Sequence, residues 1–480
     1  MAFSITTKRT LVFNEFSEEK QKEYFSFSQS KVVHNIDTFY LSCYFDEEKD
    51  YVLIENTIKK LQELKELAKT YGEPQDFKED LQIFPYGVQM YGIRLSKENM
   101  YDIFVCPTLP NKKTPRVHIQ IRSIGLWIDG AENLIHEIVE KIEKIFKIKV
   151  SDVVENRIDY AFHTNAIQNM SSYLKDDKLI KSLKSSFAIG QKIQNFGREI
   201  TTDYFALGSR ASNNLFFRMY NKTREVVEEN YKGFFIEYWY KNKLISSYDK
   251  FCLEYAYKQK SYNAIHLGRL LWYLQNGQDE DLKKEFFSLF QKCSVKSDNY
   301  DFIIKKLDAV LPAVTEIINV EFQTKREFYK SFDFSGFLKT HHKPFTRIYQ
   351  ILENRKTFIK YLTQNTVKFC KNNTSDVAYW WKRIQLCKIS NSFEESEAYR
   401  IYLRKLDKEK IHKTIAKNIA TYAIFNDKTD KFDLNEDIID YISSLNDNDI
   451  KKGHYRYDLI KEKRHKQLKP LLNIKKHDKI

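Results

Sequence analysis

Four short segments of this chain alternate between apolar and polar side chains, and this alternation restricts the fold more than any other feature. The segments are RVHIQIR (116–122), NRIDYAF (156–162), FFRMYNK (216–222) and FCLEYAYK (251–258). Successive side chains of a β-strand point to opposite faces of a sheet. We therefore expect four strands that pack one apolar face against a core and carry polar groups on the other.

Segments with helical spacing lie between these strands. The stretch 52–71 has apolar residues at helical intervals and stops before Gly72, and NLIHEIVEKIEKIF (133–146) carries one apolar stripe. Further strands are expected at 33–45, 88–95, 101–105 and 204–207. Strands interleaved with helices favour an α+β domain whose antiparallel sheet is covered by helices on one face.

The pattern changes to helices after about residue 266. Helices are predicted at 267–275, 283–293, 300–319, 346–363, 376–388, 394–426 and 436–445, followed by the basic tail 461–477. We therefore predict an N-terminal extension over 1–30, a sheet domain over 31–270, and an all-α C-terminal domain over 271–480.

Charge and composition narrow the classes of partner. The 480-residue chain has 79 Lys and Arg against 65 Asp and Glu, a formal net charge of +14. Such a balance favours polyanions, nucleic acid ahead of a membrane surface. The six cysteines form no CxxC pair, which argues against structural zinc and disulfides. No leader or long apolar run is visible, so we expect a soluble, cytoplasmic protein.

The polar faces of the four alternating segments bear an unusual assortment. An ordinary solvated face is the simpler interpretation, but such faces favour mixtures of Thr, Lys and Glu. Here two strands carry a single carboxylate, one carries a His-x-Gln pair, and one carries a tyrosine between two cations. This assortment suits phosphodiester transesterification, and its members are Asp159, Glu254, His118, Gln120, Arg218, Tyr220 and Lys222.

Tyr220 is the expected nucleophile. A phenol with a pKa of about 10 is mostly protonated at neutral pH, and the cations of Arg218 and Lys222 would favour the phenolate. Attack on a phosphodiester leaves a phosphotyrosyl ester that keeps the energy of the broken linkage. Rejoining would therefore need no ATP.

A divalent metal ion is the expected cofactor. Mg²⁺ or Mn²⁺ can polarise the scissile phosphate and offset charge in the transition state. Asp159 and Glu254 offer the hard oxygen ligands that such ions prefer. His118 or Gln120 would complete the set.

Three blocks then resemble a known family. RIDYAF (157–162), YFALGSRASNNLFFRMYNKTREV (204–226) and LEYAYK (253–258) resemble the initiators of small rolling-circle plasmids and filamentous phages, which are related to certain conjugative-transposon relaxases. The resemblance implies that Tyr220 is the nucleophile, with Arg218 and Lys222 beside it. It also places the family's aspartate at Asp159 and its glutamate at Glu254.

The sequence also departs from the family pattern. Cys252 stands where an arginine is common, and Gln120 stands where some members have a glutamate. The hairpin between Gly208 and Tyr220 is one residue longer than usual.

The resemblance implies an origin-specific nicking and joining enzyme in 31–270, with an origin-binding helical domain behind it. The expected partners are duplex origin DNA, single-stranded DNA, a host helicase and polymerase, and a second copy of the chain. No P-loop is present. A conjugative or mobilisation relaxase would use the same chemistry, and a non-catalytic DNA-binding regulator remains a third interpretation.

Overall fold

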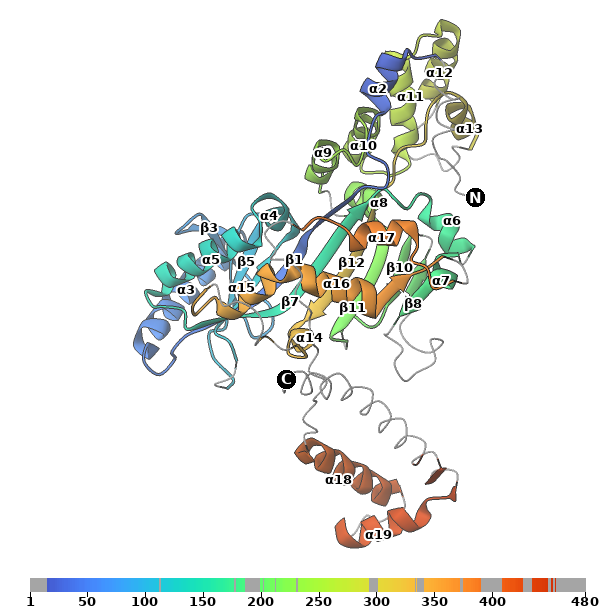
Figure 1. Cartoon of the computed structure of the whole chain (residues 1–480). Coiled ribbons are helices and arrows are strands. Elements are labelled where there is room, and N and C mark those ends of the chain that lie inside the picture. Colours follow the sequence, from blue (N-terminus) through green and yellow to red (C-terminus); the bar gives the residue numbers. More distant parts are fainter. Residues whose placement is uncertain are drawn as a thin grey trace, which may run out of the picture. The chain divides into compact units, whose positions relative to one another are not determined.

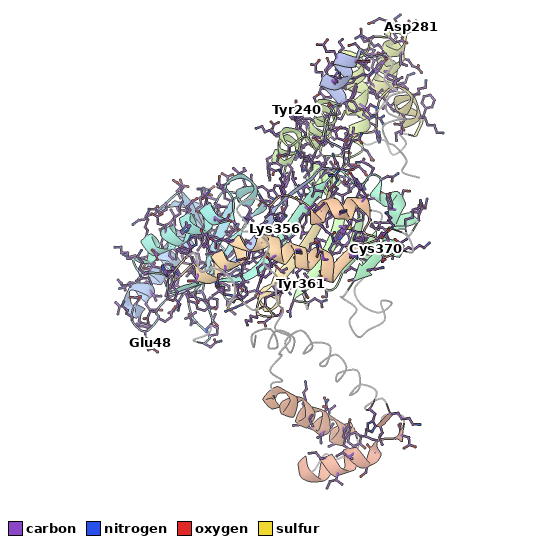
Figure 2. All side chains as sticks on the ribbon, viewed as in Figure 1. Glu48, Tyr240, Asp281, Lys356, Tyr361 and Cys370 are labelled. Carbon is purple, nitrogen blue, oxygen red and sulfur yellow. The ribbon has the colours of Figure 1, made fainter. Side chains whose placement is uncertain are left out.

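The chain forms two compact units. The computed structural model describes residues 15–111, 114–176, 178–185, 199–201, 203–211, 213–229, 232–292, 301–332, 334, 341–371, 374–389, 408–425, 434–447, 450–451 and 454. The first unit comprises Met1–Lys330 and Phe334–Ala398, and the second comprises Ser331–Asp333 and Tyr399–Ile480. Figure 1 shows the elements of both units, and Figure 2 adds their side chains.

An antiparallel sheet of eleven strands forms the centre of the first unit (Figure 1). The two 13-residue strands β1 and β7 pair along their length in its middle. From one edge to the other the strands are β2 (Gln75–Phe77), β3 (Leu81–Phe84), β4 (Ile93–Lys97), β5 (Tyr101–Val105), β6 (Val117–Ile121), β1 (Val32–Tyr44), β7 (Asp152–Thr164), β12 (Ile318–Lys325), β11 (Leu215–Asn221), β10 (Tyr204–Leu207) and β9 (Glu199–Thr201). A second sheet pairs β13 (Val367–Phe369) with β8 (Leu183–Ser185).

Helices cover one face of this large sheet, so the predicted α+β class is confirmed. On one half, Glu137 of α5 (Ala131–Phe146) accepts hydrogen bonds from Tyr101 and Lys97 of the sheet. On the other half, the ring of Trp381 lies 6.2 Å from that of Phe217. Figure 1 shows this layer in front of the strands. It contains α3 (Tyr51–Tyr71), α5, α14 (Arg326–Tyr329), α15 (Thr346–Glu353), α16 (Arg355–Tyr361), η4 (Leu362–Thr366) and α17 (Tyr379–Gln385).

The predicted end of the helix over 52–71 is confirmed. Gly72 has φ +73, which L side chains rarely adopt, and its N–H donates to the carbonyl of Lys69. The strand predictions at 101–105 and 204–207 coincide with β5 and β10. The prediction at 33–45 matches β1 to within one residue at each end, and the prediction at 156–162 lies inside β7.

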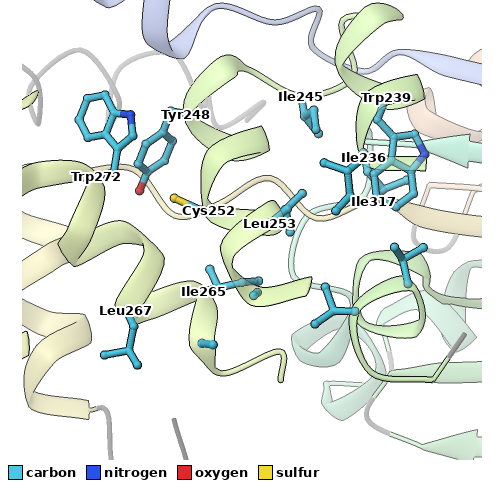
Figure 3. Close-up of a cluster of buried hydrophobic side chains, with 14 of the residues drawn as sticks. Ile236, Trp239, Ile245, Tyr248, Cys252, Leu253, Ile265, Leu267, Trp272 and Ile317 are labelled. Carbon is cyan, nitrogen blue, oxygen red and sulfur yellow. The ribbon is translucent and has the colours of Figure 1, made fainter. Parts of the chain in front are cut away.

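A helical insert separates β11 from β12. It comprises α8 (Lys222–Arg224), η3 (Glu225–Glu229), α9 (Phe234–Lys241), α10 (Ser247–Gln259), α11 (Ala264–Asn276), α12 (Glu280–Lys292) and α13 (Asp301–Val310). The N-terminal helix α2 (Glu18–Phe25) packs against it. Figure 3 shows part of the apolar core of the insert, including Trp239, Tyr248, Cys252, Leu253 and Trp272.

The strand predicted over 251–258 is wrong, because these residues lie inside α10. A capping box between Ser246 and Asp249 starts the helix. Its buried side chains, Tyr248, Cys252, Leu253 and Ala256, recur at helical intervals. A short run of alternating apolar residues also fits a helix, so the alternation alone did not decide between the two.

The division predicted at residue 270 does not match the two units. β12, which was expected to begin within a helix over 300–319, instead lies between β7 and β11 in the large sheet. The helices predicted at 346–363 and 376–388 pack on the sheet as α15, α16 and α17. The chain beyond 270 therefore contributes both a central strand and part of the helical layer to the first unit.

The remaining elements are short or belong to the second unit. In the first unit these are α4 (Ser123–Ile128), α6 (Met170–Lys175) and α7 (Lys178–Ser182). In the second, α18 (Lys408–Phe425) and α19 (Leu434–Ser444) meet through the rings of Tyr422 and Tyr441, 5.2 Å apart. Residues 1–14 of the predicted extension and the tail 461–477 lie outside the described residues. Within the described part of the chain, no helix has the length and apolarity needed to cross a bilayer.

Candidate active site

Three adjacent strands bring a set of polar side chains to the face of the sheet opposite the helical layer. Cross-strand pairing aligns Tyr220 of β11 with Asn319 of β12, and Arg218 with Glu321. The next pair along, Gln323 of β12 and Asp159 of β7, is also directly opposed. Paired residues share a face of the sheet, so these side chains lie together. We call this surface the polar face.

The phenol oxygen of Tyr220 lies among hydrogen-bonding groups. It accepts from Asn319 Nδ2 at 2.8 Å and from Lys222 Nζ at 3.4 Å, and it donates to Glu321 Oε2 at 3.4 Å. The Arg218 guanidinium lies 4.8 Å from the centre of the tyrosine ring. The side chain is 8% exposed. The nucleophile predicted from sequence is therefore buried in polar rather than apolar surroundings.

Burial dominates the ionisation of this phenol. It raises the pKa of Tyr220 above its ordinary value, and the carboxylate of Glu225 raises it further, while Lys222 and Arg218 lower it. The phenol is consequently protonated at neutral pH. Ionisation therefore requires either a proton acceptor beside the oxygen or additional positive charge.

Glu321 is the functional candidate that the sequence reasoning missed. It is 1% exposed, accepts two hydrogen bonds of 2.9 Å from Arg218, and accepts a third of 3.1 Å from Asn319 Nδ2. The signal was present in INVEFQTK (318–325), whose polar residues alternate with Val320 and Phe322. That pattern predicts a strand with Asn319 and Glu321 on one face.

Lys222 stands one residue beyond the end of β11 and begins α8. Its side chain is fully buried, and Nζ lies 2.5 Å from Glu225. Burial alone would lower the pKa of Lys222, but Tyr220, Glu225 and Asp37 together raise it above its ordinary value. The residue therefore remains an ammonium group next to the phenol.

Asp159 forms an ion pair with Arg157 two positions earlier on β7. Asp159 is 1% exposed, and burial raises its pKa to about 7 against the opposing effect of Arg157, with the nearby Glu321 carboxylate also raising it. Two carboxylates, Asp159 and Glu321, thus lie close enough on neighbouring strands to influence each other. The structure therefore places Asp159 near Glu321 and Arg218, four residues along β7 from His163, which is level with Tyr220.

Some buried polar atoms of this region lack a hydrogen-bond partner among the described residues. They are Asn319 Oδ1, Gln323 Oε1 and His163 Nε2. The His163 ring stacks on Trp127 at 4.4 Å, and its Nδ1 accepts from Trp239 at 3.1 Å. Buried polar atoms are normally satisfied, so these groups are suited to a water molecule, an ion or a substrate.

Glu254 does not join the site that the sequence predicted for it. It lies on α10 with its side chain 46% exposed, and its ion-pair partner is Lys250 of the same helix at 3.7 Å. The strand next to β11 is β12, and the carboxylate that this strand places beside Tyr220 belongs to Glu321.

His118 and Gln120 lie on the polar face but in the other half of the sheet. Gln120 pairs with Tyr40 of β1, and Tyr40 pairs in turn with Arg157. His118 lies further along β6 and contacts Asn156 at 3.1 Å. Through Asn319, Tyr220 is level with His163 on β7. His163 lies six residues from Arg157 along that strand, which is about 20 Å at 3.3 Å per residue. Among the described residues, no group of three or more His, Cys, Asp or Glu side chains is placed to hold a metal ion.

The comparisons with known proteins add little. No family model matches the chain, and no curated protein matches it. A solved structure described as a rolling circle replication initiator protein from Geobacillus stearothermophilus aligns with 75% of this chain and 100% of its own, at 9% identity and a TM-score of 0.33. A likeness at that level carries no argument about function.

Proposed function

We propose that this chain initiates rolling-circle DNA replication by nicking and rejoining one DNA strand through Tyr220. The observation that carries the proposal is the environment of the phenol oxygen. Asn319 and Lys222 donate to it, and Glu321 is placed to accept its proton. An isolated structural tyrosine has no need of two donors, one of them a buried ammonium, at the atom that would become negatively charged.

The reaction follows from these contacts. The phenol proton passes to Glu321 Oε2, and the Tyr220 oxygen attacks the phosphorus of a phosphodiester. The bond from phosphorus to the 3′ oxygen breaks, which leaves a 5′-phosphotyrosyl ester and a 3′ oxygen that takes a proton from water. Lys222 and Asn319 stabilise the developing phenolate through charge and hydrogen bonding. The free 3′-hydroxyl is the primer for a polymerase, and the reverse reaction rejoins the strand.

A divalent cation is the cofactor that we propose for this reaction. Asp159, Glu321 and Gln323 Oε1, which has no hydrogen-bond partner among the described residues, offer hard oxygen atoms on neighbouring strands. Mg²⁺ commonly uses one or two carboxylates and keeps several waters. When bound, Mg²⁺ or Mn²⁺ would act as a Lewis acid toward the phosphate. Arg218 and Arg157, which are paired with these carboxylates, would then be available for phosphate oxygens.

The test compares the wild type with Tyr220→Phe on the supercoiled circular replicon that encodes the chain, with Mg²⁺. We expect the wild type to give open circles and a protein–DNA adduct that survives denaturation, whereas Tyr220→Phe gives neither. Tyr204→Phe is the matched control, since Tyr204 lies directly opposite Tyr220 on β10. Nicking by Tyr220→Phe at the wild-type rate would disprove the mechanism.

Two alternatives have distinct outcomes. A relaxase would form the same adduct, but its loss would stop transfer of the element and not its replication. A non-catalytic regulator would bind the replicon equally well with either side chain at 220 and form no adduct. The proposal also includes origin binding by the C-terminal region. Its expected partners are a second copy of the chain and a host helicase and polymerase.

A further inference from the structure

The polar face continues beyond the active site into the half of the sheet formed by β1, β6, β5, β4 and β3. Cross-strand pairs carry it from Arg157 to Tyr40, and from His118 through Phe104 to Arg94 and Phe84. This surface lies on the opposite side of the sheet from α3 and α5. It therefore forms a continuation of the surface that bears Tyr220.

Aromatic rings and guanidinium groups alternate across this surface. Arg157 lies 5.1 Å from the ring centre of Tyr40, and Arg94 lies 4.0 Å from that of Phe84. Between them, the His118 ring is 5.6 Å from Tyr40. These five side chains are all partly exposed. We call them the aromatic–arginine surface: Tyr40, Phe84, Arg94, His118 and Arg157.

The connection between β3 and β4 extends this surface with further apolar groups. Tyr91 lies 5.5 Å from His118. Its neighbours Tyr86, Val88 and Met90 are 73%, 53% and 51% exposed. Large apolar side chains gathered on one exposed loop beside a partly exposed aromatic surface mark an interaction site rather than a core.

Ion pairs hold the arginines of this region in place. Asp102, which is 2% exposed, accepts from Arg94 at 3.0 Å and from Arg122 at 2.6 Å. These ion pairs hold the guanidinium groups in a fixed orientation on the surface. Arginine is the residue best suited to combine stacking with phosphate contact.

We propose that the aromatic–arginine surface binds an unpaired DNA strand and leads it across the sheet to Tyr220. Bases of an unpaired strand offer flat faces that stack on aromatic rings, and the strand's phosphates match the arginines. Duplex bases are already stacked and offer no such faces, so the occupant is single-stranded. From β11 to β4 the track crosses six strand spacings, about 29 Å. Its direction toward Tyr220 depends on the proposed nicking function, but strand binding itself does not.

The experiment measures the affinity of the full-length chain, in a Tyr220→Phe background, for fluorescently labelled oligothymidylate by anisotropy. Tyr40→Ala and His118→Ala should each weaken binding by about 5- to 150-fold, the cost of losing one base–aromatic stack. Tyr40→Phe should keep the affinity because it keeps the ring. The same strand annealed to oligodeoxyadenylate should bind less tightly and respond less to these changes.

Tyr71→Ala is the matched control. Tyr71 is 67% exposed at the end of α3, on the opposite side of the sheet, and its loss should leave affinity unchanged. Equal losses in Tyr71→Ala and Tyr40→Ala, or no loss in Tyr40→Ala and His118→Ala, would overturn the proposal. If a variant does not fold, photo-crosslinking of iodouracil-substituted DNA to the unmodified surface decides the question. Crosslinks absent from Tyr40, His118 and Tyr86 would count against it.

The outcomes separate this inference from the nicking proposal. A Tyr220→Phe protein that still nicks disproves the nucleophile but leaves strand affinity to be judged by the variants above. If Tyr220→Phe does not nick, and adding Tyr40→Ala to it leaves the affinity for oligothymidylate unchanged, Tyr220 remains the nucleophile and the binding surface is disproved.

Discussion

The hydrogen bond from Asn319 to the Tyr220 oxygen should contribute measurably to the rate of adduct formation. Replacing Asn319 by leucine keeps the side-chain size and removes the 2.8 Å contact. A hydrogen bond to a charged group is worth about 1.5–3 kcal/mol. If it forms fully with the developing phenolate, its loss slows the chemical step by roughly 10- to 150-fold. Asn319 is fully buried, so solvent does not screen this hydrogen bond.

The assay is single-turnover formation of the denaturation-resistant adduct with a saturating single-stranded origin oligonucleotide. A pH series adds a second readout. Because burial raises the pKa of Tyr220, the wild-type rate should rise from neutral to alkaline pH. In Asn319→Leu this rise should shift to higher pH, because the phenolate has lost a donor.

Thr324→Val is the matched control on the same strand. Thr324 is buried on the opposite face, where its hydroxyl contacts the carbonyl of Ile158 at 2.8 Å and Tyr329 Oη at 2.6 Å. This variant should lose about 1–3 kcal/mol of stability and, where it remains folded, form the adduct at the wild-type rate. The reasoning is refuted if Asn319→Leu reacts as fast as the wild type, or if Thr324→Val slows the reaction equally.

Three further predictions concern stability and the choice of carboxylate. The folded pKa of Asp159 is raised from 3.8 to about 7, so the folded state holds its proton more tightly. The unfolding free energy of the wild type, relative to Asp159→Asn, should therefore fall as pH rises from about 4 to about 7 in urea titrations; a rise would contradict the assignment. Glu254→Gln should nick normally while Glu321→Gln loses most adduct formation in the same assay, and the reverse result would restore Glu254 to the site. A Cβ at Gly268 would lie 3.2 Å from the Cys252 backbone, so Gly268→Val should lower the stability of the insert by about 1–3 kcal/mol in thermal melts, and an unchanged melting temperature would refute this packing argument.

Local sequence located most of the sheet but could not choose between two similar glutamate segments. LEYAYK (253–258) and VEFQTK (320–325) share an aliphatic residue, a glutamate, an aromatic ring and a lysine at the same positions. The first lies in a helix that starts at a capping box and buries Cys252 and Ala256 at helical spacing. The second is rich in β-branched residues, which favour strands. The flanking residues, rather than the motif, decide which glutamate reaches Tyr220.

The placement of His118 and Gln120 could not be read from the sequence for a different reason. Alternation assigned them correctly to a polar face, but it gives no strand order. In the folded sheet β1, β7 and β12 stand between β6 and β11. The two residues therefore share a surface with Tyr220 without sharing its site. The same separation gives the surface the length that we propose for binding an unpaired DNA strand.

Three ion pairs on and beside the polar face predict how the proposed DNA and metal ligands would affect each other's binding. Each cation already has a carboxylate partner: Arg218 with Glu321, Arg157 with Asp159, and Lys222 with Glu225. A phosphodiester that enters can take the arginines from their partners, and the released carboxylates can then accept a divalent cation. Neither ligand alone completes this exchange, because phosphate without the cation adds negative charge beside the phenol, and the cation without phosphate must compete with both arginines. We therefore expect DNA and Mg²⁺ to increase each other's affinity. Calorimetric titration of Mg²⁺ into Tyr220→Phe with and without the oligonucleotide measures this coupling, and equal Mg²⁺ affinities in the two titrations would show that the ion pairs do not exchange partners.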